Sequence, residues 1–161
     1  MTTIKNVCVY CGSSGRVDEV YKQAAYDAGA MVAKQGWGMV YGGGAVGLMN
    51  IVADAALENG GKAIGYIPEF LLAKEFRHEG LTELHVVDSM HERKQKMVEG
   101  ADAFLILPGG VGTMDEFFEI VTWTQLGLHT KPIIVVNING YWTHLRSLME
   151  TIITEKFARD S

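Results

Sequence analysis

Short apolar runs alternate along this chain with longer segments in which apolar residues recur at helical spacing. A continuous apolar run of about four to eight residues predicts a buried strand, whereas helical spacing over a longer segment predicts a helix with one apolar face. The predicted strands are residues 4–10, 38–41, 62–67, 83–87, 103–107 and 132–136. The predicted helices are residues 20–34, 45–58, a segment that begins at a capping-box pattern of Ser89 and Glu92, 114–125 and 141–157.

Glycine and proline separate these segments. Gly36 follows the helix over 20–34 as a C-terminal stop. Pro68 ends a strand because it has no N–H group for the ladder, and the polar residues 69–80 after it predict a loop with one helical turn. Gly36 and Pro68 therefore mark a helix end and a strand end in the predicted order of elements.

Strands that alternate with helices of this length imply right-handed βαβ crossovers. The sequence therefore predicts an α/β, Rossmann-like fold, an open parallel sheet with helices on both faces. At 161 residues the chain has the length of one domain, so residues 1–161 are expected to form a single domain.

The formal net charge of −5 argues against extended binding to nucleic acid or to a membrane surface. No leader-like N-terminal stretch and no apolar run long enough to span a membrane is present, so we expect a cytoplasmic protein. Any anionic ligand must then be held by a local site.

Cys8 and Cys11 form a C-x-x-C motif, which can indicate a redox pair or half of a zinc site. A spacing of three along a strand directs the two side chains to opposite faces. We therefore expect buried or loop thiols. The five histidines show no metal-ligand spacing, so no metal site is predicted.

Turns of small residues at 12–15, 42–44 and 109–113 each follow a predicted strand. In a parallel sheet these turns share the carboxyl edge, which is where open α/β sheets bind ligands. Their convergence on one edge is a stronger signal than any single glycine turn. We expect the ligand site at this edge.

Gly42, Gly44 and Gly47 also match the dinucleotide fingerprint G-x-G-x-x-G. That fingerprint belongs on the first βα turn, with an acidic residue at the end of the next strand, where this chain has Ile67 and Pro68. An NTPase loop is not indicated either, because neither glycine turn ends in G-K-[ST]. One bound phosphate is favoured over a dinucleotide or a triphosphate.

Residues 107–116, L-P-G-G-V-G-T-M-D-E, read as the end of a buried strand, a glycine turn and the start of a helix. Gly109, Gly110 and Gly112 would let consecutive N–H groups face an anion at the helix N-terminus. Thr113 as N-cap and Glu116 at the third helical position also fit a capping box, which would give Glu116 a purely structural role. A capping box does not explain the three glycines.

Arg93 and Lys94 lie in the first turn of a helix that also begins at the carboxyl edge. A solvated basic face explains Lys94 and Lys96 equally well, whereas an arginine fork beside the glycine turns suits phosphate contact or polarisation of a leaving group. A phosphate seat, meaning the phosphate-binding turn at 109–113, together with one arginine and one carboxylate suits cleavage of the N-glycosidic bond of a nucleoside monophosphate. That reaction passes through an oxocarbenium-like state.

Over nearly its whole length the sequence resembles the LOG (Lonely Guy) family of cytokinin-activating phosphoribohydrolases. The shared motifs are residues 9–14 (V-Y-C-G-S-S), 41–44 with 47–49, 90–94 (M-H-E-R-K), 108–113 with Glu116, and 122–127 (T-W-T-Q-L-G). Val111 stands where plant members usually carry tyrosine. Members of this family often carry the label lysine decarboxylase, but no lysine here has a Schiff-base context.

The resemblance implies a homodimer that hydrolyses AMP or N6-substituted AMP to the free base and ribose 5-phosphate, with no metal or organic cofactor. It implies Arg93 and Glu116 as the catalytic pair. The implied phosphate and substrate contacts are Ser14, Gly43, Gly44, Glu75, Met90, Lys94, Gly109, Gly110, Val111, Gly112, Thr113 and Thr122.

Two other classes of protein remain open at this point. A non-catalytic nucleotide or molybdenum-cofactor carrier would need the phosphate seat but no carboxylate directed at a sugar, so Glu116 separates it from the enzyme. An NAD-dependent oxidoreductase would use Gly42 to Gly47, and we expect no binding of NADH.

Overall fold

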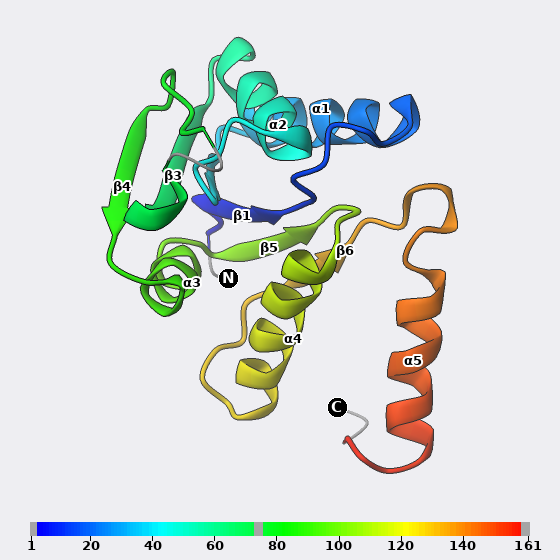
Figure 1. Cartoon of the computed structure of the whole chain (residues 1–161). Coiled ribbons are helices and arrows are strands. Elements are labelled where there is room, and N and C mark those ends of the chain that lie inside the picture. Colours follow the sequence, from blue (N-terminus) through cyan, green and yellow to red (C-terminus); the bar gives the residue numbers. More distant parts are fainter. Residues whose placement is uncertain (1–2, 73–75, 159–161) are drawn as a thin grey trace.

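The computed structural model describes residues 3–72 and 76–158, which form an open parallel sheet flanked by helices (Figure 1). The strands are β1 (Asn6–Tyr10), β2 (Gly38–Tyr41), β3 (Lys62–Pro68), β4 (Glu83–Val87), β5 (Ala103–Ile106) and β6 (Ile133–Val135). They lie in the order β4-β3-β2-β1-β5-β6, and every neighbouring pair is parallel. The predicted Rossmann-like fold is confirmed.

The helices occupy the predicted segments with shifted ends. They are α1 (Glu19–Lys34), α2 (Gly47–Glu58), α3 (Met90–Glu99), α4 (Val111–Gln125) and α5 (Thr143–Thr154), and 3₁₀ turns cover Glu69–Leu71 and Ile138–Gly140. Gly36 has φ +74°, so it takes the left-handed conformation expected of a residue that ends α1. No helix in the described part of the chain is long and apolar enough to cross a membrane.

Helices cover both faces of the sheet, with α1 and α2 on one side and α3 and α4 on the other (Figure 1). Side chains of β1 alternate between these layers, because successive residues of a strand point to opposite faces. Val7 and Val9 pack with α1 and α2, whereas Tyr10 packs with α3 and α4. Cys8 and Cys11 are buried thiols on opposite faces of the sheet, as predicted.

The order of the strands reverses between β1 and β5. From β1 the chain proceeds outward through β2 and β3 to β4, and α3 then returns it to β5 on the other side of β1. The connections that leave β1 and β5 therefore diverge at the carboxyl edge and leave a crevice between them, which is the usual ligand position in such sheets.

Candidate active site

A cavity of about 280 Å³ lies at this crevice. Six elements supply its wall: the end of β1 with its turn, the turn after β2, the start of α2, the 3₁₀ turn at Glu69–Leu71, α3 and the start of α4. The lining residues are Val9, Tyr10, Cys11, Gly12, Ser13, Gly42, Met49, Leu71, Met90, Arg93, Met97, Gly110, Val111, Gly112, Thr113, Asp115 and Glu116. The glycine turn at 109–113 and the two candidate catalytic side chains therefore share one space.

Helix α4 begins three residues earlier than predicted. Its N-cap is Gly110, which has no side chain to make a capping hydrogen bond, and its first residue is Val111. The N–H groups of residues 111–113 lie in the first turn, where a helix leaves its donors without intrahelical partners, and they border the cavity. The loop between β5 and α4 is thus a helix N-terminus open to an anion.

The capping-box interpretation of Glu116 is wrong. Because α4 starts at Val111, Thr113 is the third helical residue and Glu116 lies in the second turn, too far along the helix to serve as a cap partner. Thr113 is buried, and a Cβ atom on Gly109 would overlap its hydroxyl oxygen, which requires glycine at position 109. Glu116 is half-buried and borders the cavity.

Burial and the negative charge of Glu116 raise the pKa of two thiols near the cavity, Cys11 and Cys8. Burial raises the pKa of the Cys11 thiol far above its usual value, and Glu116 raises it further. Burial and then Glu116 likewise raise the pKa of Cys8. Both thiols therefore stay protonated at neutral pH, which excludes them as thiolate nucleophiles.

Arg93 reaches the cavity from the first turn of α3. That helix is capped by Ser89, whose hydroxyl oxygen accepts a hydrogen bond from the Glu92 N–H at 3.1 Å, as predicted. The Arg93 side chain is only 4% exposed. Its Nε donates to the Tyr66 carbonyl at 2.9 Å, and its Nη2 donates to the Gly42 carbonyl.

These two carbonyls belong to the ends of β3 and β2, so the sheet itself orients the guanidinium of Arg93. A Cβ atom on Gly42 would overlap Arg93 Nη2, so glycine at position 42 is a requirement of this contact. A fixed guanidinium beside the helix N-terminus of α4 gives the cavity a second positive feature.

The predicted site residues divide into three groups. Met90, Arg93, Gly110, Val111, Gly112, Thr113 and Glu116 border the cavity together. Ser14, Gly43, Gly44, Lys94, Gly109 and Thr122 do not border it, although Ser14 and Gly109 border an adjacent cavity of about 290 Å³. Glu75 lies outside the described residues, so its predicted contact stays a prediction.

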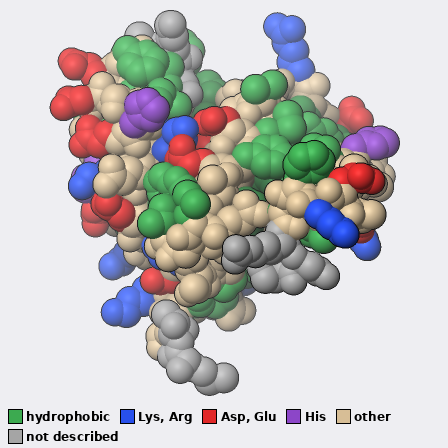
Figure 2. Space-filling model, turned by 90° about the horizontal axis from the view of Figure 1, so that it is seen from below, with side chains coloured by type: hydrophobic (Ala, Val, Ile, Leu, Met, Phe, Trp, Pro, Cys, Tyr) green, Lys and Arg blue, Asp and Glu red, His purple; other side chains and the backbone are tan. Residues whose placement is uncertain are grey.

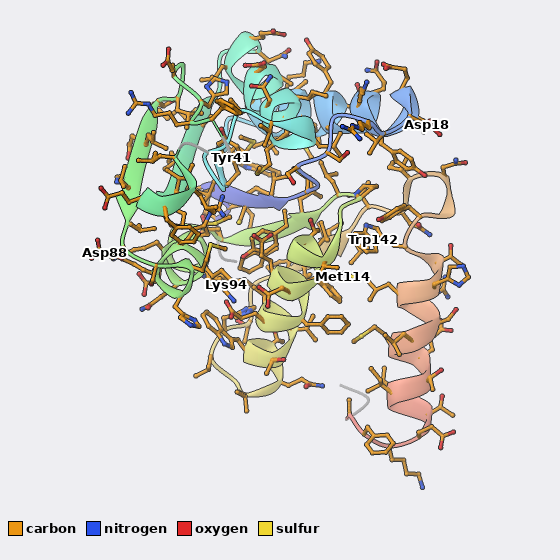
Figure 3. All side chains as sticks on the ribbon, in the orientation of Figure 1. Asp18, Tyr41, Asp88, Lys94, Met114 and Trp142 are labelled. Carbon is orange, nitrogen blue, oxygen red and sulfur yellow. The ribbon has the colours of Figure 1, made fainter. Side chains whose placement is uncertain are left out.

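Two of the predicted contacts are engaged elsewhere. Lys94 is buried between α3 and α4, and its Nζ contacts Asp115 and Glu119 (Figure 3). Thr122 is exposed on α4, and its hydroxyl donates to the Phe118 carbonyl at 2.7 Å. It lies six residues beyond Glu116, about 9 Å along the helix axis at the usual rise per residue.

Several lining residues were not predicted. Met49, Leu71 and Met97 give the cavity an apolar wall. In the sequence Met49 and Met97 look like ordinary core positions of helices, and Leu71 lies in a segment predicted as a loop. Only the packing of α2, α3 and the 3₁₀ turn at Glu69–Leu71 at the same sheet edge brings them to the cavity. The described residues contain no cluster of three His, Cys, Asp or Glu side chains that could hold a metal ion.

Fold and site together define a Rossmann-like α/β protein with a ligand cavity at its topological switch point. Residues 49–161 match the family model described as "Possible lysine decarboxylase". The chain is 49% identical over 156 residues to a cytokinin riboside 5'-monophosphate phosphoribohydrolase of Rhodococcoides fascians, over 96% of this chain and 79% of that protein. The chain belongs to the LOG family.

Plant relatives support the same assignment. The cytokinin riboside 5'-monophosphate phosphoribohydrolase LOG1 of Arabidopsis thaliana is 40% identical over 153 residues, which cover 95% of this chain and 72% of that protein. The probable cytokinin riboside 5'-monophosphate phosphoribohydrolase LOGL2 of Oryza sativa subsp. japonica is 41% identical over 157 residues, which cover 98% of this chain and 64% of that protein.

Solved structures of another class share the fold. A molybdenum cofactor carrier protein of Chlamydomonas reinhardtii superposes with a TM-score of 0.75 at 18% identity and covers 94% of this chain and 86% of its own. A molybdenum cofactor binding protein of Rippkaea orientalis gives 0.70 at 21% identity, over 94% of this chain and 87% of its own. At these identities the likeness concerns the fold alone.

Proposed function

We propose that this protein hydrolyses the N-glycosidic bond of AMP or N6-substituted AMP to give the free base and ribose 5-phosphate. The observation that supports it most is that Arg93, Glu116 and the N-terminus of α4 border one cavity. The relatives named above, which are phosphoribohydrolases, share this sequence over most of its length.

In this proposal the 5′-phosphate binds at the N-terminus of α4, where N–H groups and the helix dipole favour an anion. The ribose then lies one helical turn further along α4, beside Glu116. Arg93 binds the phosphate or the leaving base, and Met90 with the other apolar lining residues contacts the base. Ser14, Gly43, Gly44, Glu75 and Thr122 stay predicted substrate contacts.

Hydrolysis requires charge stabilisation at the ribose. As the bond from C1′ to the base nitrogen breaks, its electron pair leaves with the base and the sugar becomes oxocarbenium-like. The Glu116 carboxylate stabilises this positive charge and accepts a proton from the attacking water, whose oxygen bonds to C1′. The proton accepted by Glu116 passes to the departing base, directly or through solvent, so Glu116 returns to the carboxylate and the products are the neutral base and ribose 5-phosphate.

Lysine decarboxylation and a carrier role fit the site less well. Decarboxylation of lysine through a Schiff base needs a reactive lysine, and no lysine is among the described residues that border the cavity. A carrier needs no carboxylate beside the sugar, whereas Glu116 borders the cavity without a capping role.

Incubation with AMP, isopentenyl-AMP, GMP, CMP and IMP, followed by chromatography of the free bases, tests the reaction and the substrate together. We expect release of adenine or the N6-substituted adenine, with equal amounts of ribose 5-phosphate. Binding of AMP without release of any base would instead favour the carrier.

We also propose a cytoplasmic homodimer. Apolar side chains gather in patches on the face seen in Figure 2, and Leu126, Leu128, Ile134 and Leu148 are exposed on or near α4, β6 and α5. Thr122 is too far along α4 to reach the substrate beside Glu116 of its own subunit, so a predicted contact by Thr122 requires a second copy. Light scattering after size exclusion should give twice the chain mass, and a monomer at micromolar concentration would contradict the dimer.

A further inference from the structure

The two candidate catalytic residues come from different helices, and a buried lysine links those helices. Arg93 is on α3 and Glu116 is on α4. Lys94 follows Arg93 directly in the chain, and its two carboxylate partners, Asp115 and Glu119, lie on either side of Glu116 in the sequence. The separation of α3 and α4 therefore governs how far Arg93 stands from Glu116.

The contacts of Lys94 are close and largely shielded from water. Its Nζ lies 2.9 Å from Glu119 Oε2 and 3.1 Å from Asp115 Oδ2. The Lys94 side chain is 10% exposed and that of Glu119 is 23% exposed, whereas Asp115 is 59% exposed. Burial lowers the pKa of the Lys94 ammonium, but the hydrogen bonds to Glu119 and Asp115 outweigh burial and raise it.

Lys94 is placed poorly for direct contact with a nucleotide. It is absent from the residues that border the cavity, although its neighbour Arg93 and its partner Asp115 border it. The charge of its ammonium is balanced by two carboxylates, so it offers little attraction to a phosphate.

We propose that Lys94 is a positioning residue, which fixes α3 against α4 and thereby sets the distance between Arg93 and Glu116, and that it does not contact the substrate. The proposal rests on the proposed function of the cavity, and it replaces the substrate contact that the family resemblance implies for this residue.

The arrangement has an asymmetry that a test can use. Asp115 and Glu119 are both on α4, so loss of Lys94 removes the cation that joins α3 to them and leaves the largely buried Glu119 carboxylate without its partner. Hydration of that carboxylate then loosens the packing of α3 against α4. Loss of the Glu119 charge alone leaves the pair of Lys94 with Asp115. A second substitution that removes the Glu119 charge should therefore restore part of what the loss of Lys94 removes.

The test compares Lys94→Met, Glu119→Gln and the double variant with the wild type. We expect Lys94→Met to lower kcat about tenfold or more, while inhibition by ribose 5-phosphate, which reports phosphate affinity, changes less than about threefold. The double variant should recover at least about threefold of the lost kcat. Lys96→Met is the matched control. Lys96 is half exposed on the same helix, and its Nζ lies 3.8 Å from Glu99 Oε2, which makes a weak surface ion pair. We expect this variant to behave as wild type.

Amide hydrogen exchange gives a readout independent of activity. Lys94→Met should speed amide exchange in α3 and α4 but not in α1. If Lys94→Met fails to fold, Lys94→Arg takes its place in the test; it keeps the charge, so its exchange and kcat should stay near those of the wild type. Weakened inhibition by ribose 5-phosphate of tenfold or more with unchanged exchange would overturn the proposal in favour of direct phosphate contact. An inactive wild type with the expected change in exchange would refute the proposed function but not the link between the helices.

Discussion

Replacing Glu116 with glutamine should lower the turnover of AMP by at least about a hundredfold, the lower range for loss of an acid/base group. The amide keeps the shape of the side chain but cannot accept a proton from water or neutralise an oxocarbenium ion. AMP affinity should stay within about threefold, because the phosphate binds at the start of α4 and not at Glu116.

Single-turnover release of adenine and equilibrium binding of AMP measure the two effects separately. Glu150→Gln serves as the control, since Glu150 is an exposed glutamate on α5 whose side chain pairs with Arg146. Unchanged release of adenine by Glu116→Gln would end the catalytic role of Glu116. A loss of AMP affinity as large as the loss of turnover would instead make it a binding residue.

Replacing Arg93 with alanine should reduce both catalysis and stability. The buried guanidinium donates hydrogen bonds to the carbonyls of Tyr66 and Gly42, and both acceptors lose a charged donor. Such losses cost about 2–4 kcal/mol of the free energy of unfolding. Turnover should fall about a hundredfold or more, and AMP affinity should weaken, because a fixed cation beside the phosphate seat is removed.

Urea unfolding and steady-state kinetics on the folded fraction separate the two losses. Arg93→Lys keeps the charge, but an ammonium cannot reproduce the guanidinium fork, so we expect it to recover only part of the stability and less of the rate. Wild-type stability and rate in Arg93→Ala would show that Arg93 is only a charge near the cavity.

Most of the sheet was predictable because its signals are local. The predicted strands at 38–41 and 83–87 match β2 and β4 residue for residue. Gly36 ended α1 as expected, since a residue with positive φ there favours glycine whatever surrounds it. The capping pair Ser89 with Glu92 was also recognisable, because both partners lie within one helical turn.

The start of α4 was harder to predict. Thr113 is a good capping residue by type, and the glycines before it resemble a loop, so the pattern favoured a later start. In the structure Gly110 caps the helix without a side chain, and Thr113 is buried against Gly109 instead. Packing at the sheet edge outweighs the local preference of a threonine for the cap position.

The sequence alone determined the succession of strands and helices along the chain, the parallel sheet and the glycine turns at its carboxyl edge. Each of these depends on periodicity or backbone freedom within a few neighbouring residues. Only the tertiary structure decided that Arg93 is oriented by the ends of β2 and β3, that Glu116 borders the same cavity, and that Lys94 is bound to α4. These contacts join segments far apart in the chain, and their geometry depends on how the crossover helices pack on the sheet.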